Sequence, residues 1–215
     1  MRLTLFSAAL LATGITSAAV PVDGWYTSVF GGYTYVPDNV RLYTFFGNFI
    51  NNSSFNNGYN AGGRVGYQSN PMRYELEYTY IHANARFFKV NFIGQTGVTG
   101  YSSGNLAMAN VYYDTPEVLP SVAPFLGFGI GYAYIQDRLN SLSPLGYATF
   151  LSVNESAFAV QGTAGFTYNF AENYAMNLAY RYVSTTSTSN NLGLRYQAHI
   201  ANAGVVYHFD NGSYK

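Results

Sequence analysis

The sequence predicts an all-β fold: a closed antiparallel transmembrane β-barrel of about eight strands, with short periplasmic turns and four long extracellular loops. Three observations favour it. Charged residues make up only 9% of the 215 residues, whereas aromatic residues reach 18%, and the formal net charge is zero. Apolar and polar residues alternate over many short segments, and the connections between these segments alternate in length. A barrel fits this composition because only every second residue of a strand faces lipid.

Eight segments show the period-two alternation of a strand, with an apolar or aromatic face opposite a polar or small one. They are long enough to cross a bilayer as tilted strands. Tyrosines close the apolar face at the ends of several segments, where amphipathic rings suit the membrane–water boundary. The segments are residues 25–35, 59–68, 73–81, 105–114, 125–134, 157–169, 174–182 and 198–209.

The connections alternate between short and long, which is typical of outer-membrane barrels. The short ones are 69–72, 115–120 and 170–173, and the long ones are 37–58, 82–104, 135–156 and 183–196. A periplasmic N-terminus places the long loops outside the cell. A soluble β-sandwich remains the structural alternative, because it too is built from short alternating strands.

Residues 118–136 carry no charge and are long enough for a membrane-spanning helix. Pro120 and Pro124 disfavour a helix interior, as do glycines at 127, 129 and 131. Leu126, Phe128 and Ile130 alternate with these glycines, so we predict a strand here.

The N-terminus has the features of a secretory signal peptide, with Arg2 before an apolar run and small residues at 17–19. We expect cleavage after Ala19, a barrel over 20–209 and a short periplasmic tail over 210–215. An uncleaved membrane anchor is the alternative. The chain has no cysteine, which excludes disulfides and suits passage through the oxidising periplasm.

Several motifs resemble small eight-stranded outer-membrane barrels of the OmpA-like and opacity-type surface families. They are FLGFGIGY at 125–132, LAYRY at 178–182 and AGVVYHF at 203–209. The resemblance implies an integral outer-membrane protein of a Gram-negative bacterium. It also implies that Val205, Tyr207 and Phe209 form the terminal-strand signal for the barrel-assembly machinery. Here residues 210–215 follow that signal, and we expect no peptidoglycan-binding domain.

Charged residues on the predicted inner faces suggest a network in the lumen. If 69–72 is a turn, Arg64 lies opposite Glu77, because paired positions then sum to 141. Glu75 lies diagonally nearby, and Arg73 and Arg181 point the same way. Two interpretations stay open: a salt-bridged plug, since an unpaired buried charge is costly, or a gate that opens a narrow conduit by exchanging partners.

The predicted loops contain aromatic residues that suit protein or glycan contact. The candidates are Tyr43, Phe45, Phe46, Phe49, Phe87, Phe88 and Phe92. The alternative is that the strands continue beyond the membrane and these rings pack on one another or meet lipid headgroups.

We expect no catalytic site, cofactor or metal. Outer-membrane enzymes that modify lipid A use a histidine with a serine two residues on, whereas His199 is followed by Ala201. The expected partners are outer-membrane lipid and lipopolysaccharide, the assembly machinery and an extracellular ligand of the loops, and not nucleic acid. The leading hypothesis is a surface adhesin, surface antigen or membrane-structure protein; a narrow porin and a lipid-modifying enzyme are the alternatives.

Overall fold

The computed structural model describes residues 23–37, 43–45, 48–119, 121–142, 146, 148–186 and 195–209. The expected signal peptide and C-terminal tail lie outside these ranges. The described chain forms eleven strands. They are β1 (Gly24–Tyr35), β2 (Tyr43–Phe45), β3 (Asn48–Phe55), β4 (Gly58–Ser69), β5 (Met72–Val90), β6 (Ile93–Gly94), β7 (Thr96–Asp114), β8 (Val122–Leu142), β9 (Ala148–Asn169), β10 (Tyr174–Thr185) and β11 (Gln197–His208).

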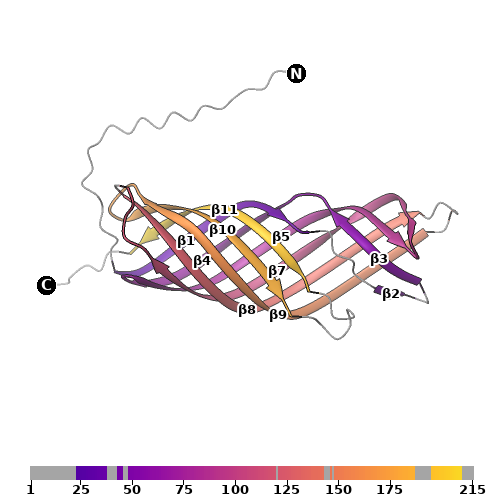
Figure 1. The fold of residues 1–215 in the computed structure, drawn as a ribbon, viewed down its shortest axis with the longest axis horizontal. Coiled ribbons are helices and arrows are strands. Elements are labelled where there is room, and N and C mark those ends of the chain that lie inside the picture. The colour runs from indigo at the N-terminus through magenta and orange to yellow at the C-terminus, as the bar shows by residue number, and fades with distance from the viewer. Residues whose placement is uncertain are drawn as a thin grey trace, which may run out of the picture.

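Eight strands close into an antiparallel ring (Figure 1). The order around the ring is β5, β4, β1, β11, β10, β9, β8 and β7, and β7 pairs back with β5. Closure removes free sheet edges, whose backbone N–H and C=O groups could not form hydrogen bonds with lipid. The predicted barrel of eight strands is therefore confirmed.

Alternation along each strand sorts the residues between the two faces of the wall. In β1, Val29 is 68% exposed on the outside, whereas its neighbour Phe30 is buried inside. In β8, Leu126, Phe128 and Ile130 face out, as their period predicts. Among the described residues there is no helix long and apolar enough to span a membrane.

The two ends of the barrel differ. At one end, which we call the turn end, three short connections join β4 to β5, β7 to β8 and β9 to β10. At the opposite end, the hairpin end, strands β5, β7, β8 and β9 run far beyond β1, β4, β10 and β11 (Figure 1). For example, β8 and β9 stay paired up to Leu142 and Ala148, whereas β10 pairs with β9 only from Ala159 onward.

These extensions correct the predicted loops. Residues 82–104 and 135–156 are mostly strand, because β5, β7, β8 and β9 have 19, 19, 21 and 22 residues. The predicted loop 37–58 contains β2 and β3, and β3 pairs with β5 beyond the last β4 pair. The alternative that strands continue past the membrane describes these segments better.

Candidate functional site

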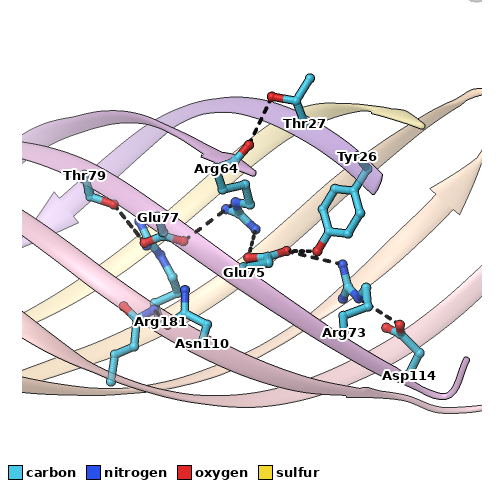
Figure 2. A network of polar contacts seen from close by, with 11 residues as sticks. Tyr26, Thr27, Arg64, Arg73, Glu75, Glu77, Thr79, Asn110, Asp114 and Arg181 are labelled. Atoms are coloured by element: carbon cyan, nitrogen blue, oxygen red, sulfur yellow. Dashed lines mark hydrogen bonds and ion pairs between the residues drawn. The ribbon is translucent and has the colours of Figure 1, made fainter. Parts of the chain in front are cut away.

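Six charged residues inside the barrel form one alternating series, which we call the charge chain. In spatial order it consists of Asp114, Arg73, Glu75, Arg64, Glu77 and Arg181 (Figure 2). Every acid lies beside at least one arginine, and three positive charges balance three negative ones.

The distances within the charge chain are those of close ion pairs. Arg73 Nε lies 2.8 Å from Asp114 Oδ2, and Arg73 Nη1 lies 3.7 Å from Glu75 Oε1. Arg64 lies 3.5 Å from Glu75 and 3.6 Å from Glu77. Arg181 Nη1 donates to Glu77 Oε1. Tyr26 also donates to Glu75 Oε1, at 2.6 Å.

The contact between Arg181 and Glu77 crosses the lumen. Arg181 is on β10 and Glu77 is on β5, and these strands are opposite each other in the ring. Both side chains are almost completely buried, at 1% and 0% exposure. Because this pair spans the interior, it closes the lumen at its level.

Aromatic rings pack against the guanidinium groups of the charge chain. The guanidinium groups of Arg64 and Arg181 lie 4.4 and 4.9 Å from the ring centre of Phe30. Arg73 lies 4.7 Å from the ring of Phe125. A desolvated guanidinium over a ring face adds a favourable cation–π contact, so the rings both fill the space and retain the charges.

The sequence-predicted network residues are brought together. Arg64 pairs with Glu77 in the β4–β5 register, as the turn predicted, and Arg73, Glu75 and Arg181 face the same interior. Sequence reasoning missed Asp114 as the partner of Arg73, together with Tyr26, Phe30 and Tyr112, whose ring centre lies 5.1 Å from the Arg73 guanidinium. Their inward parity was the available signal, but parity does not give a partner on a distant strand.

Above the charge chain, toward the hairpin end, the lumen is mostly apolar, although Asp137 of β8 is also buried there. A continuous core there includes Ile81, Leu106, Ile135, Leu151 and Ile200, all at most 6% exposed. This arrangement differs from the polar interior that outer-membrane barrels usually have. The lumen is thus sealed by paired charges and then by packed hydrocarbon.

Below the charge chain, the turn end contains a cavity of about 390 Å³. Its lining includes Tyr26, Arg73, Asp114, Asn177 and His208. Tyr26, Arg73 and Asp114 belong to the charge chain or contact it, so the cavity ends there. Among the described residues no group of histidines and acids is arranged to hold a metal ion.

The outer wall carries two belts of aromatic rings. Toward the turn end, Trp25 packs on Tyr67 and Tyr174 on Tyr207, with ring centres 5.5 and 5.1 Å apart. Toward the hairpin end, the belt includes Tyr35, Tyr59, Tyr80, His82, Tyr101, Tyr182 and His199. Such belts lie at the two membrane–water boundaries, so the wall between them marks the bilayer.

His199 belongs to this second belt. Its Nδ1 lies 2.6 Å from the hydroxyl of Tyr180, and Ala201 occupies the next outward position of β11. In the terminal strand, Val205 and Phe209 are exposed and Tyr207 is half-buried.

The candidate loop contacts are placed differently from one another. Phe92 is 85% exposed at the tip between β5 and β6, and Phe87 is half-buried. Phe88 is fully buried in the apolar core, so its prediction as a surface contact was wrong: a register shift at Arg86 in the β3–β5 pairing turns Phe88 inward. Phe46 and the side chains of Tyr43, Phe45 and Phe49 lie outside the described part of the structure.

The comparison with family models decides the class of this barrel. The model named outer membrane protein beta-barrel domain matches residues 4–209. The chain belongs to that family. It is therefore an integral outer-membrane β-barrel of Gram-negative bacteria.

Solved structures agree on the fold. Neisserial surface protein A superposes with a TM-score of 0.55 at 16% identity, covering 86% of this chain and 97% of that one. OprG from Pseudomonas aeruginosa gives 0.53 at 12% identity, covering 87% and 98%. The outer membrane protease OmpT from Escherichia coli also gives 0.53, at 10% identity, covering 87% and 97%.

These likenesses show the fold alone, and one of them is to an enzyme. Curated proteins gave no significant match to the barrel.

Proposed function

We propose that this barrel is a surface protein that holds β-hairpins outside the cell on a sealed, non-catalytic transmembrane scaffold. Its role is that of an adhesin, surface antigen or membrane-structure protein. The observation that carries the proposal is the contrast between a lumen filled by the charge chain and apolar core and strands that run far past the bilayer. The long strands project beyond the membrane, whereas the filled lumen leaves no open pore.

The strand lengths support projection. A tilted strand needs about 9–11 residues to cross the hydrocarbon core, whereas β8 and β9 have 21 and 22. About half of the β8–β9 hairpin therefore lies beyond the aromatic belt at the hairpin end. Outer-membrane barrels keep short turns in the periplasm and long connections outside, which puts the hairpin end on the cell surface.

The projecting surface suits contact with another molecule. On β9, Phe150 is 60% exposed, and Ser152, Asn154 and Ser156 share its outward row. Phe92 is exposed at the neighbouring tip. Exposed rings among polar side chains are typical of protein- and glycan-binding surfaces.

Shortening the β8–β9 hairpin tests the adhesin form. Replacement of residues 140–150 by Asn-Gly joins the paired positions Leu139 and Leu151 through a two-residue turn. We expect the variant to fold, as a heat-dependent gel shift would show, and to lose most of the adhesion of displaying cells to host cells and matrix glycans. The control replaces the turn 171–173 at the opposite end with glycine and serine. Adhesion that survives in a folded, shortened variant would count against this form.

A narrow channel is the second candidate, and the cavity at the turn end favours it. Passage requires the Arg181–Glu77 pair to separate and the apolar core above it to open. Because both would have to move, we expect no reproducible conductance from the purified barrel in planar lipid bilayers. Stable single-channel steps from the native protein, absent from empty bilayers, would instead identify a porin.

Catalysis on lipid is not supported by the residues at the rim. His199 has a tyrosine hydroxyl at its Nδ1, and the position where a serine nucleophile would stand is Ala201. A nucleophile within hydrogen-bond reach of its base is the minimum for this chemistry.

A further inference from the structure

The outer wall has an apolar groove over β5, β7 and β8, bordered by β9. It arises because Ala107 and Ala109 on β7 are small, while their neighbours on both sides are large. The groove has a volume of about 670 Å³, and its walls include Leu76, Tyr78, Ile130, Tyr132 and Phe158. Since it lies between the two aromatic belts, it faces hydrocarbon.

The strand register shows what lies above the groove. Tyr78, Ala107 and Tyr132 are aligned across the three strands. Two residues higher, the aligned row is Tyr80, Asn105 and Tyr134, and the next is His82, Ser103 and Gln136. The row above that is Asn84, Tyr101 and Arg138. The wall therefore changes from apolar to polar and then to cationic along one line.

The upper rows carry hydrogen-bonding groups on the outside of the wall. Tyr78 donates to Asn105 at 2.6 Å, and Gln136 donates to Tyr134 at 3.3 Å. Arg138 is exposed, lies 5.9 Å from the ring of Tyr101, and makes no ion pair with any residue in the described part of the chain. Its guanidinium is available to an anion from outside the protein.

We propose that this wall is a seat for one phosphorylated glycolipid of the outer leaflet. An acyl chain lies in the groove, the sugars meet the polar rows, and a phosphate meets Arg138. Arginine binds phosphate through two parallel hydrogen bonds, and Arg138 stands six residues above Tyr132, roughly 20 Å along the strand. The inference rests on the proposed orientation, with the hairpin end outside.

A second groove on the wall provides a contrast. It has a volume of about 640 Å³ over β8–β11, includes Ala164 and Ala201, and extends toward Thr115 and Pro124 at the turn end. No arginine or lysine lines it. It therefore offers a site for an acyl chain without a cationic partner for a phosphate.

The test is native mass spectrometry of the folded, detergent-purified barrel with three probes: bisphosphorylated lipid A, the same lipid A without phosphates, and phosphatidylglycerol. The native protein is expected to prefer bisphosphorylated lipid A. Arg138→Gln is expected to remove that preference, weakening bisphosphorylated lipid A by about tenfold, the size of a charge-assisted hydrogen bond. Ala107→Leu fills the groove and is expected to weaken both forms of lipid A alike.

Matched variants make the result specific. Arg86→Gln removes another exposed arginine of the hairpin end, and Ala164→Leu fills the other groove; neither is expected to alter lipid A binding. The proposal is overturned if Arg138→Gln keeps the preference, if Arg86→Gln removes it equally, or if the native protein binds the three probes alike. Should Ala107→Leu not fold, Ala109→Leu serves the same purpose. Surface labelling of the hairpin end tests the orientation separately, so correct labelling without lipid A preference overturns this seat alone.

Discussion

Glu77 connects the two halves of the charge chain. It lies beside Arg64 from the adjacent strand and Arg181 from across the ring. Two buried guanidinium groups thus share this carboxylate, although Arg64 also has Glu75 as a partner. Removing one partner of a buried pair leaves a charge without compensation, which costs more than the pair itself gains.

Glu77→Gln should therefore destabilise the barrel by about 3 kcal/mol. The amide keeps the shape of the side chain but removes the negative charge that faces both arginines. The midpoint of unfolding in denaturant, followed by the gel shift and circular dichroism in lipid vesicles, measures the change. Glu172→Gln, in an exposed turn, is the matched control and should change stability by less than about 0.5 kcal/mol. Equal midpoints for the two variants would contradict the importance of the charge chain.

At this scale, the sequence could predict a neighbour but not a partner across the lumen. Arg64 and Glu77 followed from one short turn, because the turn sets the register of a hairpin. The contact of Arg181 with Glu77 links residues 104 positions apart. To predict this contact one must know the shift in strand register at which the ring closes. The alternation of residues along a strand does not contain that information.

Along the long strands, the alternation of polarity reverses at the membrane boundary. Within the bilayer the outward row of β8 is apolar, with Phe128, Ile130 and Tyr132. Farther on, the outward row is Gln136, Arg138 and Asn140, while the inward row of Ile135, Asp137 and Leu139 is buried and mostly apolar. The strand keeps its period of two, but its solvent changes from lipid to water.

This reversal explains the missed extensions. A segment expected to be apolar on its lipid face ends where that face becomes polar, so residues 135–156 looked like a loop. The same residues form a regular hairpin whose apolar side packs into the upper lumen. Phe88 was misplaced for a different reason: a register shift at Arg86, where β5 pairs with β3, reverses the alternation of β5 and turns Phe88 into the core.

Substitutions on the two parts of the hairpin should therefore differ. Ile130→Arg places a charge on the lipid face and should cost about 2–4 kcal/mol, whereas Asn154→Arg, on the outward row beyond the belt, should cost less than about 1 kcal/mol. Reversible unfolding in vesicles compares them directly. If both arginines cost the same, the boundary is not where the aromatic belt and the reversal put it.

For the whole molecule, the fold could be predicted because its signals are global: few charges, recurrent alternation and connections that alternate in length. The way the lumen is filled could not be predicted, because it depends on which inward-facing rows of side chains meet inside the closed ring. The result is a wall that satisfies its backbone by closure and an interior divided into a cavity, a charge chain and an apolar core. Such a molecule is better suited to presenting surfaces at its hairpin end than to conducting solutes.

The central claim is that the hairpin end lies outside the cell, and single-cysteine labelling tests it most directly. The natural sequence has no cysteine, so Ser152→Cys marks the β8–β9 hairpin and Glu172→Cys marks the opposite turn without background. A large, membrane-impermeant maleimide applied to intact cells should label the Ser152→Cys variant and should label Glu172→Cys only after the outer membrane is permeabilised. Labelling of Glu172→Cys on intact cells, with Ser152→Cys protected, would show that the barrel projects its hairpins into the periplasm and would contradict the account.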